Sequence, residues 1–207
     1  FMDVIYFAVN ILFYKVLYRH TSLLGDWNEP QIMIFVAGYL LLKSIYMTFL
    51  GNNIWLFPIL VNKGDLDYYL LRPVSSMFFL SCRDISINSF VNLLIAVGIF
   101  VVSIDRYPEV LSAWQILFYL ILIGNGVFLY FALRMLFILP VFWTHSARGL
   151  DEMYMGIHNL LERPDRIFTG FMRGLLVSLM PFCLMCSFPA RLILDGFSWP
   201  VFLHIVV

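Results

Sequence analysis

The sequence predicts an all-α membrane protein with six transmembrane helices. Of its 207 residues, 62% are hydrophobic and only 13% are charged, and the mean hydropathy is +0.89. A water-soluble core cannot bury that much apolar surface. Apolar runs recur at intervals that fit bilayer crossings of about 20 residues. The alternating pattern of barrel strands is absent, so we expect helices, which pair their backbone groups internally.

The expected spans follow one another with short connectors rich in turn-forming residues. They cover residues 1–18, 31–50, 77–103, 111–142, 167–185 and 197–207. The fourth is longer than one crossing, so we expect its end to project from the membrane. The apolar spacing over residues 147–162 then predicts an interfacial helix. We expect a single domain, residues 1–207, truncated at both ends, because the chain begins and stops within apolar sequence.

Basic residues divide unequally between the two sets of connectors. One side would carry Lys63, Arg72, Arg83, Arg148, Arg163 and Arg166. The other side would carry Arg19, Arg106 and Arg191. The positive-inside rule therefore places the first side, and both termini, in the cytoplasm.

The connector between the second and third spans, residues 62–76, has helix signals of its own. Asp65 is a candidate N-cap after a flexible Gly64, and Pro73 would stop the helix. The apolar positions at helical spacing are Leu66, Tyr69, Leu70 and Pro73. The opposite face would carry Asp65, Tyr68 and Arg72. This pattern predicts a two-turn amphipathic helix with a face open to a soluble partner, or a connector whose charges only mark the interface.

No catalytic or metal site is predicted. The phosphate-binding pattern G-x-x-x-x-G-K-[ST] is absent, so the chain is not expected to hydrolyse ATP itself. Cys183 and Cys186 lack the further ligands that zinc requires. The acidic and histidine residues His145, Asp151, Glu152 and His158 spread over more than one helical face, and we interpret them as interfacial. With 13 basic and 13 acidic residues, no nucleic-acid surface is expected.

Two charged residues fall inside expected spans, Lys43 in the second and Arg134 in the fourth. A charge at the centre of a membrane helix costs about 3 kcal/mol on insertion scales unless it is paired or solvated. These residues either line a substrate path or dimer contact, or reach a nearby interface with their long side chains.

Residues 64–74, GDLDYYLLRPV, resemble a signature, approximately G-x-L-D-x-x-L-L-R-P, of permease subunits in type-2 ATP-binding-cassette exporters. A second match lies downstream, where Arg163-Pro164 precedes the fifth span and two prolines, Pro181 and Pro189, follow it. Phe142-Trp143 corresponds to the aromatic pair that often ends the fourth span of such permeases. The matches cover residues 62–196 in the family's order.

The resemblance implies a dimer of permeases, with an identical or a homologous second copy, in a prokaryotic inner membrane. Each permease would be bound by an ATPase subunit that holds ATP and Mg, while this chain binds no cofactor. The family's coupling helix corresponds to residues 62–76. The residues expected to contact the ATPase are therefore Gly64, Asp65, Asp67, Leu70, Leu71, Arg72 and Pro73.

The resemblance also implies that residues 181–199 form a re-entrant helical hairpin on the outer face, before the last span. Its prolines, Pro181 and Pro189, suit breaks in helical structure, and Arg191 joins Lys43 and Arg134 as a candidate for the translocation path or dimer contact. The implied function is the transmembrane subunit of an ATP-driven exporter. The alternative is a membrane anchor or scaffold that recruits an ATPase but transports nothing, and the cargo stays open.

Overall fold

The computed structural model describes residues 2–24, 27–71, 73, 75–144, 148–161, 163 and 185–194. The described residues are helical and contain no strand beyond one isolated bridge between Leu24 and Trp27, which confirms the all-α prediction. The helices are α1 (Met2–Tyr18), α2 (Glu29–Tyr46), η1 (Met47–Gly51), α3 (Asn52–Lys63), α4 (Leu66–Leu70), α5 (Ser76–Cys82), α6 (Ile87–Asp105), α7 (Ala113–Ile138), α8 (Val141–Thr144), α9 (Arg148–Leu161) and α12 (Ser187–Leu194).

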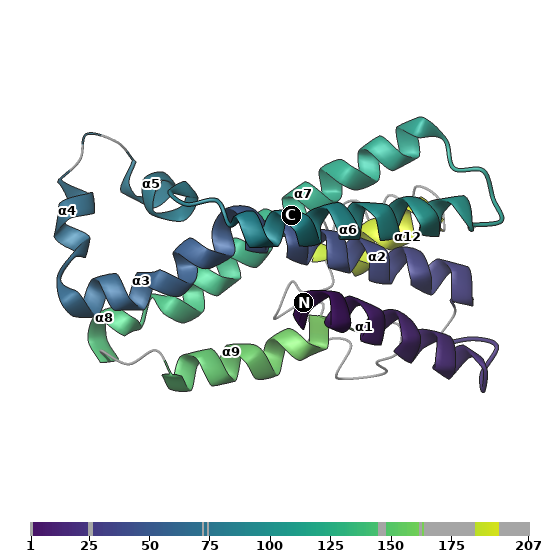
Figure 1. The fold of residues 1–207 in the computed structure, drawn as a ribbon, viewed down its shortest axis with the longest axis horizontal. Coiled ribbons are helices and arrows are strands. Elements are labelled where there is room, and N and C mark those ends of the chain that lie inside the picture. The colour runs from purple at the N-terminus through teal and green to yellow at the C-terminus, as the bar shows by residue number, and fades with distance from the viewer. Residues whose placement is uncertain are drawn as a thin grey trace.

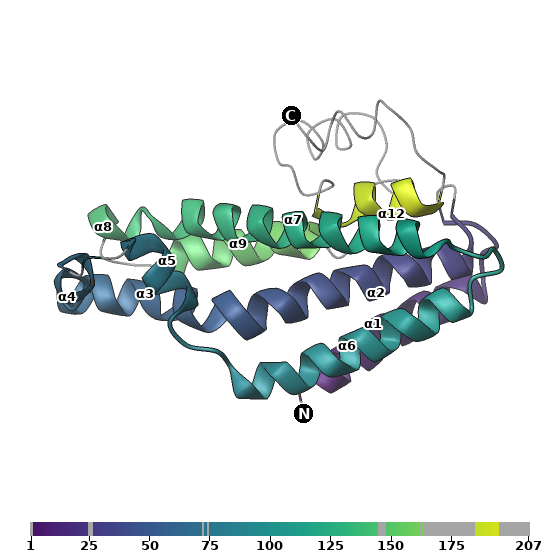
Figure 2. The same cartoon turned by 90° about the horizontal axis from the view of Figure 1, so that it is seen from above.

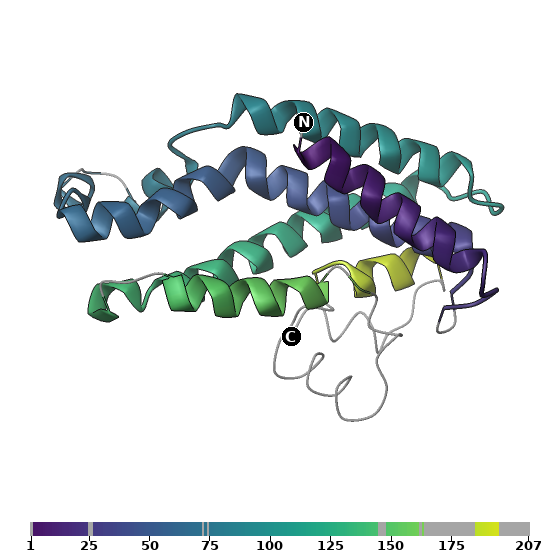
Figure 3. The ribbon, with the colours of Figure 1, turned by 60° about the horizontal axis from the view of Figure 1, so that its bottom comes forward.

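The helices form an elongated bundle with α2 and α3 as its middle layer. Helices α1 and α6 lie on one side of this layer, and α7, α9 and α12 lie on the other (Figures 2 and 3). The short α4 is at one end of the bundle, beside α8, and the connections from α1 to α2 and from α6 to α7 are at the other end (Figure 1). The bundle therefore has an α4 end and an opposite end.

Three helical stretches are long and apolar enough to cross a membrane: Glu29–Lys63, Ile87–Asp105 and Ala113–Thr144. Helix α1 matches the first expected span, although its 17 residues make it only about 25 Å long. The fifth and sixth expected spans, 167–185 and 197–207, lie outside the described residues apart from Met185.

The prediction made the second span too short. Instead of ending at Leu50, the helical path passes through a π-helical turn at Met47–Gly51 and continues as α3 to Lys63. It continues because the residues after Gly51 remain apolar, and Ile54 and Phe57 are buried against the end of α7. Single π turns of this kind are frequent at functional sites.

The third expected span, 77–103, is wrong as one segment, because the chain forms α5 and α6 with a break at 83–86. Ser86 caps the new helix by accepting a hydrogen bond from the Ser89 N–H at 3.4 Å. The Ser86 N–H in turn donates to the Thr48 carbonyl in the π turn at 3.0 Å. Polar partners outside the segment therefore compensate for the helical hydrogen bonds lost at the break.

Helix α7 confirms the long fourth segment. It begins with a capping box, in which Ser112 accepts from the Gln115 N–H at 3.3 Å and its own N–H donates to the Gln115 side chain at 2.8 Å. Gly126 lies where the backbone of Met185 crosses α7, and a Cβ there would collide with the Met185 carbonyl. Small residues permit such close approach in membrane proteins, where packing replaces the hydrophobic driving force.

Helix α12 lies within the expected re-entrant segment, 181–199, of which the structure describes residues 185–194. All eight of its residues are buried, against α7 and α2. Pro189 falls in its first turn, where the backbone N–H groups have no intrahelical partner, so this proline helps to start a helix and does not interrupt one. Pro181 lies outside the described residues.

Candidate functional site

The connector after the second span folds into a tight turn at the α4 end of the bundle (Figure 1). Helix α3 ends at Gly64, which has φ 76 and ψ 4 and donates its N–H to the Val61 carbonyl at 3.2 Å. This left-handed conformation favours glycine, because other residues place Cβ too near the backbone. Gly64 therefore has a defined role as the cap of α3, more specific than the flexibility expected from the sequence.

Two expectations about this turn are wrong. Asp65 has helical backbone angles, φ −70 and ψ −14, and its side chain makes no capping hydrogen bond. Helix α4 has one turn, Leu66–Leu70, instead of two. The reason is the preceding Gly64, which turns the chain so tightly that Asp65 enters the new helical turn directly. Arg72, expected at the end of the helix, lies outside the described residues, and Pro73 follows the turn.

Helix α4 is held to the bundle by its inner side. Leu66 is buried in a cluster with residues of α3, α5, α7 and α8. The Tyr69 ring packs on Phe79 with 5.9 Å between centroids, and its hydroxyl accepts a hydrogen bond from the Arg83 guanidinium. Arg83 also forms an ion pair with Asp84 at 2.8 Å. The turn is thus attached to both α3 and α5.

The outer side of the turn is exposed. Asp67 is exposed, and the exposed fractions of Tyr68, Leu70 and Leu71 are 75%, 54% and 84%. Leu70 was expected on the buried face with Leu66, but five residues are too few to bury both. Two exposed leucines beside a tyrosine and a carboxylate form a small amphipathic surface of the kind that protein partners cover.

Asn53 joins α3 to the end of α5, and no pattern in the sequence singles it out. Its buried side chain donates to the carbonyls of Ser81 and Asp84, both at 2.9 Å, and accepts from the Asp84 N–H at 3.1 Å. These bonds join α3 to the end of α5 across the break in the third expected span. A buried amide with satisfied partners on another segment fixes the relative position of the two segments.

Gly64→Val is expected to destabilise the protein by about 1.5 kcal/mol, because φ 76 is unfavourable for every residue with a Cβ. For a chain of this size, this corresponds to a fall of about 5 °C in Tm in detergent micelles. The control is Gly149→Val on α9, where a Cβ also meets open space and φ is not positive. Equal Tm values for the two variants would contradict the capping role of Gly64.

Arg134 is buried in α7 and forms an ion pair with Asp151 of α9, with 2.7 Å between Nη2 and Oδ1. Its guanidinium also lies 4.5 Å from the centre of the Tyr154 ring. Only 8% of the Arg134 side chain is exposed. The Arg134 side chain therefore does not reach the membrane–water interface. Its charge is instead paired with the Asp151 carboxylate on α9, which folds back along α7.

Lys43 belongs to the same region. Its ammonium lies 3.7 Å from the centre of the Tyr6 ring, a cation–π contact between α2 and α1. Lys43 and Arg134 line one cavity of about 490 Å³, beside the π turn and the start of α6. The structure thus brings together the two charged residues that the sequence singled out inside spans.

Asp151 and His158 are not simply interfacial, as the sequence suggested. His158 is buried, with its two ring nitrogens 3.4 and 3.5 Å from the hydroxyls of Tyr39 and Tyr130. Asp151, Tyr154 and His158 recur at intervals of three and four residues, which places them on one face of α9. That spacing could have shown that the three residues share a face. It does not identify their partners on α2 and α7.

Pro189 and Arg191 lie apart from Lys43 and Arg134. Pro189 lines a second cavity, of about 370 Å³, with residues of the first turns of α7, among them Trp114 and Tyr119. The buried Arg191 guanidinium lies 5.1 Å from the centre of the Phe188 ring. The expected path residues therefore fall into two separate groups.

The described helices and their apolar composition define an integral membrane protein, and the described residues hold no cluster of three or more metal-binding side chains. A family model for ABC-2 family transporter protein matches residues 4–207, so the chain belongs to this family and is a permease subunit of an ABC transporter. Permeases of the family generally act with a separate ABC ATPase subunit. Searches of curated proteins and of solved structures found no match.

Proposed function

We propose that the chain is the transmembrane subunit of an ATP-driven exporter and that the turn at residues 62–76 couples it to the ATPase. Family membership supports the transport role. The observation that carries the coupling role is the exposed surface of Asp67, Tyr68, Leu70 and Leu71 on a turn whose inner side is firmly packed. A partner bound to this surface would contact a well-packed part of the bundle.

The helical path from α4 back into the bundle supports this role. Helix α3 continues through the π turn into α2, whose residues are mostly buried between the two outer layers. Asn53 ties α5 to the same path. The Ser86 N–H, just before α6, donates to the Thr48 carbonyl in the π turn. A displacement of α4 would therefore move α2 and the start of α6 together, which is the kind of rigid-body change that alternating access requires.

The rest of the proposed arrangement follows from the family and from charge. Lys63 ends α3 next to α4, and Arg106 follows α6 at the opposite end of the bundle (Figure 1). The unequal division of basic residues in the sequence, six against three, supports a cytoplasmic α4 end. Six spans, a re-entrant segment at 181–199 and a permease dimer in an inner membrane complete the proposal. Lys43 and Arg134 would line the path through their common cavity.

Asp67→Lys tests the coupling surface. In the complete transporter, this change is expected to weaken binding of the ATPase subunit about tenfold, a typical effect of reversing a charge in an interface. Membrane insertion and Tm should be unchanged, because Asp67 is exposed. Asp105→Lys, an exposed carboxylate at the opposite end of the bundle, is the control. Equal ATPase binding by both variants would contradict the proposal.

The alternative function, an anchor that recruits an ATPase without transport, makes the same prediction for Asp67→Lys. The two functions differ in vesicles that contain the reconstituted complex. A permease gives ATP-dependent flux for at least one member of a panel of amphipathic, peptide and saccharide cargoes. An anchor binds and hydrolyses ATP with no flux for any of them.

A further inference from the structure

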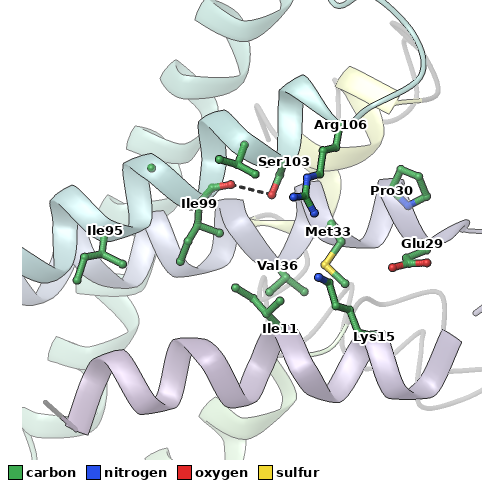
Figure 4. Close-up of a pocket in the computed structure, with 12 residues that line it drawn as sticks. Ile11, Lys15, Glu29, Pro30, Met33, Val36, Ile95, Ile99, Ser103 and Arg106 are labelled. Atoms are coloured by element: carbon green, nitrogen blue, oxygen red, sulfur yellow. Dashed lines mark hydrogen bonds between the residues drawn. The ribbon is translucent and has the colours of Figure 1, made fainter. Parts of the chain in front are cut away.

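A groove of about 620 Å³ lies between α1, α2 and α6, away from the cavity that holds Lys43 and Arg134. Its walls are apolar along most of their length, as Figure 4 shows. The apolar side chains are Ile11, Met33, Val36, Ile95, Ile99 and Val102. A volume in this range holds a molecule of several hundred daltons. Because the apolar walls belong to helices of a membrane protein, lipid acyl chains are compatible occupants of the groove.

Among the described residues, the charged side chains of the groove gather at one end. Lys15 in the last turn of α1, Glu29 in the first turn of α2 and Arg106 at the end of α6 form this rim. In Figure 4 the Lys15 ammonium and the Arg106 guanidinium both point toward the space beside Met33. The structure records no ion pair of Lys15 or Arg106 with any described residue. The rim thus has two cations and one carboxylate, a net positive charge.

The three charged residues stand where α1 and α6 end and α2 begins, at the end of the bundle opposite α4 (Figure 1). This is the level at which spanning helices meet lipid headgroups. The groove therefore combines an apolar channel at the depth of the acyl chains with a cationic rim at the depth of the headgroups. Basic pockets between transmembrane helices are known to bind anionic lipid headgroups on the cytoplasmic side, and the same charge attraction applies at the opposite end of the bundle.

We propose that this groove binds one phospholipid with an anionic headgroup. One acyl chain would lie along Ile11, Ile95 and Ile99, and Lys15 and Arg106 would hold the phosphate. Glu29 disfavours a second negative charge close to it and leaves room for a polar headgroup with hydroxyl groups. A phospholipid matches both parts of the groove at once, because its acyl chain suits the apolar walls and its phosphate suits Lys15 and Arg106. This binding does not depend on export or on the ATPase.

Gly98 offers a means of blocking the groove. It lies on the groove wall in α6, and a Cβ placed there meets no atom within 4 Å. Gly98→Phe would therefore add a side chain on the groove wall without a clash at its Cβ, and its ring would occupy space that the acyl chain needs. Gly124→Phe is the matched control, because a Cβ at Gly124 on α7 also meets no atom within 4 Å and this residue is not part of the groove.

The test is native mass spectrometry of the complete transporter released from bilayers of dioleoyl phosphatidylglycerol mixed with dioleoyl phosphatidylcholine. The wild-type protein should retain one phosphatidylglycerol per chain, with a preference over phosphatidylcholine of about tenfold. Lys15→Gln combined with Arg106→Gln should abolish the preference, and Lys63→Gln, at the other end of the bundle, should not. Gly98→Phe should remove the retained lipid, while Gly124→Phe should keep it.

Several results would overturn the proposal. One is equal retention of both lipids by the wild-type protein. Another is unchanged retention in both the Gly98→Phe and the Lys15→Gln, Arg106→Gln variants. A Gly98→Cys variant provides a further check, since a disulfide between two chains at this position would show that a second copy occupies the groove.

Discussion

Replacing Asp151 by leucine is expected to cost about 3 kcal/mol, because the change leaves the Arg134 guanidinium charged and buried without its carboxylate. The Nη1 atom of Arg134 already has no hydrogen-bond partner among the described residues, and the Tyr154 ring beside the guanidinium carries no formal charge to replace the carboxylate. For a chain of this size, we expect Tm in detergent micelles to fall by about 8 °C. The matched control is Glu152→Leu, an exposed carboxylate on the next residue, with an expected change within about 0.5 kcal/mol.

A double variant separates the ion pair from other effects at this position. Arg134→Met with Asp151→Leu removes both charges, and replacing a buried pair by apolar residues is often neutral or stabilising. We therefore expect the double variant to recover most of the lost Tm. If it were as unstable as Asp151→Leu alone, the uncompensated charge would not be the cause of the instability.

Asn53→Leu is the second change with a large expected effect, about 3 kcal/mol. Leucine has nearly the same size but leaves the Asp84 N–H and the carbonyls of Ser81 and Asp84 without the partner that they have now. Each unsatisfied buried backbone group costs about 1–3 kcal/mol, although those near Asp84 are partly open to solvent. Hydrogen exchange at the amides of Asp84 and Ser86 should accelerate, because the hold between α3 and α5 is lost.

Asn52→Leu is the control for this change, since Asn52 is exposed and adjacent. It should alter neither Tm nor exchange at Asp84. The Asn53→Leu protein should also couple ATP hydrolysis to transport less efficiently, as its α5 is no longer tied to α3. Unchanged exchange at Asp84 in Asn53→Leu would mean that the three hydrogen bonds do not hold the break between α5 and α6.

The helical class and the approximate places of α1, α2, α6 and α7 were predictable from apolar runs, because a lipid environment permits few alternatives to helices. The interruptions were not predictable. The break at 83–86 depends on Asn53 and Thr48, which are more than 30 residues away in the sequence. The continuation from α2 into α3 depends on the burial of α3 against α7. An apolar run has the same composition whether it packs against protein or faces lipid, so the sequence alone does not reveal this burial.

The turn at residues 62–76 was predictable from its own signals, and Gly64 precedes its helix as expected, but the helix ends at Leu70, before it reaches Pro73. Which leucines face outward was not predictable, since this depends on Leu66 reaching a cluster formed by α3, α5, α7 and α8. The cost of placing the Arg134 charge in the membrane was predictable. Its partner Asp151 was not, because the sequence does not determine the direction in which α9 lies along α7. Local patterns thus indicated the residues that need partners and left the partners open.

The most direct test of the coupling role places a photoreactive benzoylphenylalanine at position 71, where Leu71 is 84% exposed, in the complete transporter. The same group at position 110, where Val110 is 98% exposed at the opposite end of the bundle, serves as the comparison. We predict a cross-link to the ATPase subunit from position 71 and none from position 110. A cross-link from position 110 alone, or from neither position, would contradict the account.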